Sequence, residues 1–291
     1  MLKTMKRILA LLSLILPFGA GVAHAEPTRF TVEVRGQGPD VILIPGLTSS
    51  AAVWRDTAAR LEGRYRVHLV QVAGFAGAPV AGNAEGPVVA PLADEVLAYI
   101  AGQKLDHPAI IGHSMGGFTA LLIAARHPDS VGRVMVVDAL PFFSVLINPA
   151  ATATAVEPQA AAFRDSLLGQ SDAAFTASQP QVVAGLAKTD AARAEALAWS
   201  LASDRGVMAR ATYDVMTTDL RGELATIGTP VTVVYARDTA MGFFYRVVDQ
   251  IYATNYAALP GVALRRVDGA FHYLMLDQPE PFAAEVERFL K

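Results

Sequence analysis

The sequence contains no cysteine among its 291 residues, which excludes disulfide bonds, thiolate metal sites and a cysteine nucleophile. It also lacks an internal repeat and metal-ligand spacings such as H-E-x-x-H. No run of basic residues is present, and the formal net charge is −3. We therefore expect neither a metal site nor a nucleic-acid partner.

Long apolar runs are also missing, except at the N-terminus. There, three basic residues precede an apolar run over residues 8–16, and Ala23-His24-Ala25 follows as an A-x-A cleavage pattern. The run is shorter than the roughly twenty residues that cross a bilayer. This pattern predicts a secretory signal peptide over residues 1–25, cleaved after Ala25. We expect a bacterial periplasmic or secreted protein whose mature chain has no membrane span.

Strand and helix patterns alternate along the remaining chain. Helical patterns separate the apolar strand patterns, which predicts a mostly parallel, doubly wound α/β sheet with helices on both faces. The strand patterns cover residues 30–34, 41–44, 65–72, 108–111, 134–138, 231–235 and 262–267.

The alternation stops over residues 139–221, where alanine-rich helical stretches occur without a clear strand. We interpret this segment as a helical cap inserted after the sixth strand, over the carboxyl ends of the strands, where such sheets bind ligands. The core then comprises residues 26–138 and 222–291.

The most specific motif is Gly112-His113-Ser114-Met115-Gly116, between an apolar strand pattern and a helical pattern. A G-x-S-x-G sequence in this context is typical of a nucleophile elbow, a sharp turn that exposes the serine hydroxyl. The motif predicts acyl transfer through a serine ester, with Ser114 as the nucleophile.

Together with Pro45-Gly46-Leu47 and Phe271-His272, this motif resembles the α/β-hydrolase family over nearly all of the predicted mature chain. The resemblance implies that His272, after the last strand, is the catalytic base. It also implies the chain order Ser…Asp…His for the catalytic residues.

Two aspartates are candidates for the acid that orients His272. Asp238, just after the strand pattern at residues 231–235, is the leading candidate. The sequence departs from the family there, because the usual glycine after that strand is missing. Asp138, at the end of the preceding strand pattern, is the alternative, since some relatives carry the acid at that position.

The resemblance assigns the oxyanion hole to the backbone N–H groups of Leu47 and Met115. Proline at position 45 has no N–H, but Leu47 retains one, so both donors are present.

Apolar residues near the predicted acids are candidates for the lining of an acyl or alcohol pocket. We therefore expect a small ester substrate with an apolar portion and a reaction that needs no cofactor. A lactonase, an aminopeptidase, a cofactor-free haloperoxidase and a catalytically idle ligand-binding homologue remain alternatives, because fold does not fix function. The candidate pocket residues are Leu140, Phe142, Phe143, Met241 and Phe243.

Overall fold

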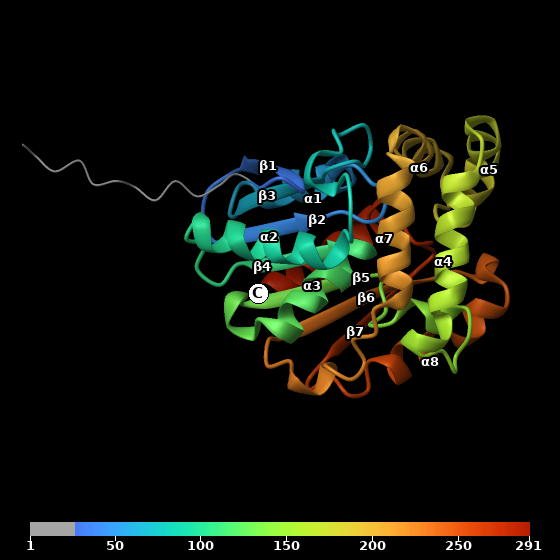
Figure 1. Cartoon of the computed structure of the whole chain (residues 1–291). Coiled ribbons are helices and arrows are strands. Elements are labelled where there is room, and N and C mark those ends of the chain that lie inside the picture. Colours follow the sequence, from blue (N-terminus) through green and yellow to red (C-terminus); the bar gives the residue numbers. More distant parts are fainter. Residues whose placement is uncertain (1–26) are drawn as a thin grey trace, which may run out of the picture.

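A computed structural model describes residues 27–291, and the predicted signal peptide at residues 1–25 lies outside them. Seven strands form one sheet in the order β1-β3-β2-β4-β5-β6-β7, shown in Figure 1. Only β1 runs antiparallel to its neighbour, β3; the other pairs are parallel. The predicted doubly wound α/β fold is therefore confirmed. The strands are β1 (Phe30–Arg35), β2 (Asp40–Ile44), β3 (Arg66–Val72), β4 (Ala109–His113), β5 (Arg133–Val137), β6 (Val231–Arg237) and β7 (Ala263–Asp268).

The central strands are apolar on both faces, because helices cover both sides of the sheet. In β2, Ile42 and Ile44 belong to one buried cluster, and Val41 and Leu43 belong to the other. This division follows the two-residue period of a strand.

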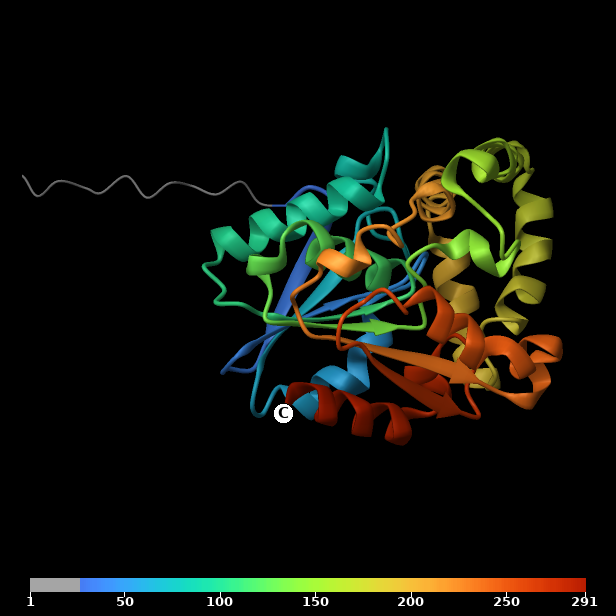
Figure 2. The same ribbon diagram turned by 90° about the horizontal axis from the view of Figure 1, so that it is seen from below.

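The two helical layers are visible in Figure 2. The layer with α2 (Val89–Gly102), α3 (Met115–Arg126) and α8 (Phe243–Asn255) shares its buried cluster with Ile42. The opposite layer, with α1 (Arg55–Leu61) and α10 (Pro279–Leu290), packs against Val41. The helix α8 was not expected from the sequence.

Four further helices lie between β5 and β6, in the segment interpreted above as a cap. Figure 1 shows them beyond the ends of the strands toward which the parallel arrows point. The segment follows β5, the fifth strand of the described chain, so the expectation that it follows the sixth strand is wrong. Each helix begins with a side chain that accepts an N–H of its first turn, namely Thr152, Ser171, Thr189 and Asp204. The helices are α4 (Ala153–Gly169), α5 (Asp172–Ala184), α6 (Asp190–Ala202) and α7 (Arg205–Thr217).

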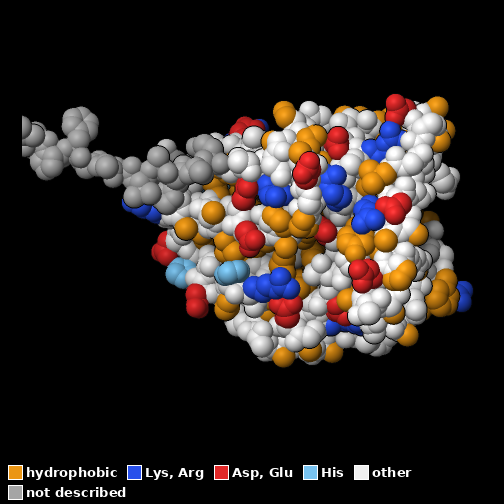
Figure 3. All heavy atoms as spheres, in the orientation of Figure 1, with side chains coloured by type: hydrophobic (Ala, Val, Ile, Leu, Met, Phe, Trp, Pro, Cys, Tyr) orange, Lys and Arg blue, Asp and Glu red, His pale blue; other side chains and the backbone are white. Residues whose placement is uncertain are grey.

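Short helical segments complete the described chain. Within residues 27–291, no helix is both long and apolar enough to cross a membrane. On the face shown in Figure 3, acidic and basic side chains are interspersed. The short segments are α9 (Leu274–Asp277) and the 3-10 turns Ala51–Trp54, Ala81–Asn83, Pro128–Ser130, Phe143–Leu146, Leu224–Thr226 and Thr239–Met241.

Candidate active site

Ser114 occupies the turn between β4 and α3. Its backbone has φ 53° and ψ −120°, a conformation that costs energy for a residue with a side chain and that is concentrated at functional sites. The neighbouring structure enforces it: the Ser114 N–H donates to the Val137 carbonyl at 2.8 Å, and its carbonyl accepts from the Phe118 N–H at 2.8 Å. The turn is thus held between the end of β5 and the first turn of α3.

The motif glycines are required by close backbone approach. A Cβ at Gly112 would lie 2.2 Å from the Gly116 carbonyl oxygen, and one at Gly116 would lie 2.3 Å from that of Ile44. At Gly46 a Cβ would lie 3.0 Å from the Ser114 Cβ. Larger residues would therefore push apart the strands and the helix that present Ser114.

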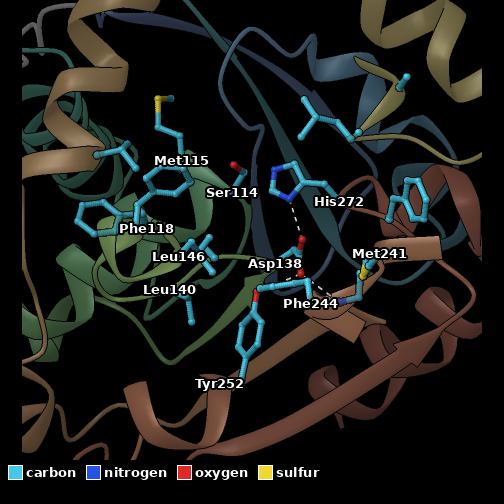
Figure 4. Close-up of a pocket in the computed structure, with 18 of the residues that line it drawn as sticks. Ser114, Met115, Phe118, Asp138, Leu140, Leu146, Met241, Phe244, Tyr252 and His272 are labelled. Atoms are coloured by element: carbon cyan, nitrogen blue, oxygen red, sulfur yellow. Dashed lines mark hydrogen bonds and ion pairs between the residues drawn. The ribbon is translucent and has the colours of Figure 1, made fainter. Parts of the chain in front are cut away.

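His272 lies in the loop between β7 and α9, far from Ser114 in the sequence. Its Nδ1 lies 2.7 Å from Oδ2 of Asp138. Figure 4 shows the imidazole between Asp138 and Ser114, with one ring edge toward each. With the Nδ1 proton donated to the carboxylate, Nε2 carries the lone pair on the side of Ser114.

Asp138, not Asp238, is therefore the carboxylate that the structure brings to His272, and the leading expectation is corrected. Asp238 is only 7% exposed, but its carboxylate is bound elsewhere. Its Oδ2 lies 2.5 Å from Lys188 Nζ, and its Oδ1 accepts the Ala240 N–H at 2.8 Å. The Lys188 ammonium holds the pKa of Asp238 below its ordinary value.

Two further donors bind the other oxygen of Asp138. Its Oδ1 accepts the Ala236 N–H and the Tyr252 hydroxyl, both at 3.0 Å. Burial, reinforced by the negative charge of Asp138, raises the pKa of Tyr252 well above its ordinary value, so the phenol stays protonated. Tyr252 was not predicted from the sequence as a site residue. The signal available for it was the pair Tyr252 and Tyr256, four residues apart and so on one helical face.

The two candidate oxyanion donors come from the segments that follow β4 and β2. Met115 is the first residue of α3, where its N–H has no acceptor within the helix. Leu47 follows β2, and its carbonyl accepts the hydroxyls of Thr48 and Ser49. Within residues 27–291 the N–H of Leu47 has no acceptor in the chain. Neither N–H is therefore bound within the described residues, as an oxyanion donor requires.

A cavity of about 520 Å³ connects Ser114, Asp138 and His272. Three predicted lining residues, Leu140, Phe143 and Met241, do line it. The expectation for the other two is wrong. Phe142 is fully buried outside the lining, with the Arg221 guanidinium 4.9 Å from its ring centroid, and Phe243 is 78% exposed at the start of α8. The remaining apolar lining comes from both core and cap, including Met115, Phe118, Leu146, Leu186, Val215 and Phe244.

His113 is buried behind the site. Its Nε2 lies 2.9 Å from the His272 carbonyl oxygen, so it donates an N–H there. Its ring centroid lies 4.5 Å from that of His272. Burial, together with repulsion from His272, lowers the pKa of His113 well below its ordinary value. A neutral His113 thus supports the backbone of His272.

Asp277 ties the cap to the His272 loop. This carboxylate is 7% exposed and accepts the N–H groups of Lys188, Thr189 and Phe271 at 3.0 to 3.1 Å. The Tyr273 N–H also donates to the carbonyl of Leu186, a cavity-lining residue. One wall of the cavity is therefore fixed to the segment that carries His272.

The family is identified by a match over most of the chain. The model of the alpha/beta hydrolase family matches residues 41–285. The chain belongs to the alpha/beta hydrolase family. It is similar to the pimeloyl-[acyl-carrier protein] methyl ester esterase of Aeromonas hydrophila, with 38% identity over 113 residues, covering 39% of this chain and 42% of that protein. The esterase of the same name from Aliivibrio salmonicida is 31% identical over 112 residues, covering 38% and 40%. The matches thus span about two fifths of these relatives.

Solved structures of alpha/beta hydrolases share the fold over nearly the whole chain. The enol-lactonase from Burkholderia xenovorans LB400 has a TM-score of 0.73 and 20% identity, covering 90% of this chain and 96% of that one. A thermophilic esterase from Thermogutta terrifontis has a TM-score of 0.74 and 15% identity, covering 90% and 92%. At these identities the likeness concerns the fold alone.

Proposed function

We propose that the protein is a serine hydrolase that cleaves a carboxylic ester through an acyl-enzyme, with Ser114, His272 and Asp138 as its catalytic residues. The observation that carries the proposal is the 2.7 Å contact between His272 Nδ1 and Asp138 Oδ2 in a cavity that also contains Ser114. The similarity to methyl ester esterases supports the ester as the substrate class.

The arrangement can carry out both halves of ester hydrolysis. His272 Nε2 takes the Ser114 hydroxyl proton while Oγ attacks the carbonyl carbon, and the N–H groups of Leu47 and Met115 bind the oxyanion. The tetrahedral intermediate expels the alcohol, which takes the proton from His272. His272 then deprotonates a water molecule, which attacks the acyl-enzyme carbonyl. Ser114 leaves with a proton from His272, and the carboxylic acid is released. No step needs a cofactor or a metal.

The cavity lining favours an ester with an apolar portion. Apart from Ser114, Asp138, His272 and Tyr252, the side chains that line the cavity are apolar. An apolar acyl or alcohol group would lose its water shell there and gain about 25 cal/mol per Å² of buried apolar surface.

The test is hydrolysis of p-nitrophenyl esters of graded acyl length by the chain from Glu26 onward, with Ser114→Ala in parallel. We expect turnover that Ser114→Ala lowers by at least about a thousandfold. The preferred acyl length would show how long an acyl group the cavity accepts. If the folded protein hydrolyses none of these esters, the proposal fails. Lactones, aminoacyl amides and peroxide-dependent halogenation would then test the alternatives, and ligand binding without turnover would indicate an idle homologue.

We also propose that the protein is exported, on the basis of the N-terminal pattern of the sequence. Expression of the full chain in a Gram-negative bacterium should give a periplasmic or secreted product whose first residue is Glu26. A cytoplasmic product with residues 1–25 intact would contradict this.

A further inference from the structure

The carboxylate of Asp138 is held from three directions. His272 Nδ1 binds Oδ2, whereas the Ala236 N–H and the Tyr252 hydroxyl bind Oδ1. An ionised carboxylate only accepts hydrogen bonds, so Tyr252 must be the donor. Asp138 itself has φ 49°, a conformation that needs support from its surroundings.

Tyr252 is itself held in place by burial and by contacts with two other tyrosine rings. Its side chain is almost fully buried, and its ring stacks on Tyr235, with centroids 4.3 Å apart and planes 15° apart. The Tyr256 ring is nearly parallel to that of Tyr252, with centroids 6.3 Å apart and planes 7° apart. The Tyr256 hydroxyl donates to the Ala139 carbonyl at 2.8 Å. Tyr252 on α8 and Tyr256 directly after its end therefore direct two hydroxyls to two consecutive residues, Asp138 and Ala139.

We propose that Tyr252 is a positioning residue: its hydroxyl holds Oδ1 of Asp138, so that Oδ2 stays aligned on Nδ1 of His272. The proposal rests on the catalytic roles given above. Without this donor, Oδ1 keeps one hydrogen bond, from Ala236, and the carboxylate can rotate away from the imidazole. Tyr252 thereby acts on catalysis through Asp138 and not through the reacting atoms.

The matched variants are Tyr252→Phe and Tyr235→Phe. Both remove one hydroxyl from the same stack, but the Tyr235 hydroxyl donates to Asp249 at 3.0 Å, away from Asp138. We expect Tyr252→Phe to lower kcat roughly tenfold, as for the loss of a hydrogen bond to a charged group, with little change in KM. Tyr235→Phe should leave kcat within about twofold of the wild type. Equal kcat values for the two variants would overturn the proposal.

A double-mutant cycle separates positioning from a merely structural role. In an Asp138→Asn background, Tyr252→Phe should cost almost nothing. A tenfold loss in that background would indicate a general structural effect.

A measurement independent of turnover keeps this inference distinct from the proposed function. The Nδ1 proton of His272, assigned by its absence in His272→Gln, should give a downfield proton NMR signal. We expect Tyr252→Phe to shift or broaden that signal and Tyr235→Phe to leave it unchanged. An unchanged signal in folded Tyr252→Phe would refute the positioning role, whether or not the protein hydrolyses esters.

Discussion

The loops after β5 and β6 each carry an aspartate, and their surroundings differ. Asp138, after β5, faces the imidazole of His272 and the phenol of Tyr252. Asp238, after β6, faces the ammonium of Lys188 and the N–H of Ala240. Both side chains are largely buried, so burial does not separate them. The groups opposite each carboxylate decide which one can orient a base and which one holds the cap.

The largest expected effect of this difference is on catalysis. Asp138→Asn should lower kcat by roughly 10³- to 10⁴-fold, because the imidazole loses the charge and orientation that the carboxylate supplies. Asp238→Asn is the matched change after the next strand and should alter kcat less than about threefold. Ester hydrolysis by the two purified variants measures both values, and a larger loss for Asp238→Asn would reverse the comparison.

A related variant tests whether the second aspartate can replace the first. Lys188→Met frees Asp238 of its ion pair, but Asp238 Oδ1 still accepts the Ala240 N–H. We expect Asp138→Asn combined with Lys188→Met to remain as slow as Asp138→Asn alone. Recovery of a tenth of the wild-type rate would show that Asp238 can serve His272.

A third carboxylate, Asp277, should matter more for stability than Asp238. It is buried and binds three backbone N–H groups from two segments. Asp277→Asn should lower the free energy of unfolding by about 2 kcal/mol, since hydrogen bonds to a charged group are lost. Urea denaturation measures this loss. Asp190→Asn, at a fully exposed carboxylate of α6, is the control and should change stability by less than about 0.5 kcal/mol.

The buried His113 beside the elbow should make the free energy of unfolding depend on pH. His113 has a pKa well below its ordinary value of 6.5, so below that value the unfolded chain binds a proton that the folded chain does not. Stability should therefore fall as pH decreases, by up to about 1.4 kcal/mol per pH unit from this group. Between about pH 7 and pH 5.5, we expect His113→Gln to lose less unfolding free energy than the wild type. The same slope in both proteins would assign the effect elsewhere, with His68 the next candidate, because burial also lowers its pKa.

The smallest expected effect concerns the Asp238–Lys188 pair. The Lys188 side chain is 42% exposed, so the pair should contribute about 1 kcal/mol or less. Because the pKa of Asp238 is lowered in the folded protein, this contribution is present above its ordinary value of 3.8 and is lost as pH falls through the lowered pKa. Thermal unfolding of Lys188→Met and Asp238→Asn should give equal small losses that do not add in the double variant. Additive losses would show that the two side chains act separately.

Much of the fold follows from local patterns in the sequence. The apolar runs of β2, β4 and β5 have the length and flanking turns of buried strands, and the cap helices begin at Thr, Ser and Asp residues that bind their own first turns. The elbow was predictable because it too is a local pattern. Its glycines are required by close contacts within the strand–turn–helix unit and with the adjacent strand β2. The helix α8 was not predicted.

Sequence patterns were enough to predict Ser114 at the elbow, His272 after the last strand and two carboxylates at strand ends. The partners of these groups became visible in the folded chain: Asp138 contacts His272, Tyr252 from α8 binds Asp138, and Lys188 from the cap binds Asp238. Strand and turn patterns depend on neighbours a few residues away, whereas the partner of a carboxylate depends on side chains from distant segments. Between Asp138 and His272, 134 residues apart in the chain, no local pattern records the hydrogen bond.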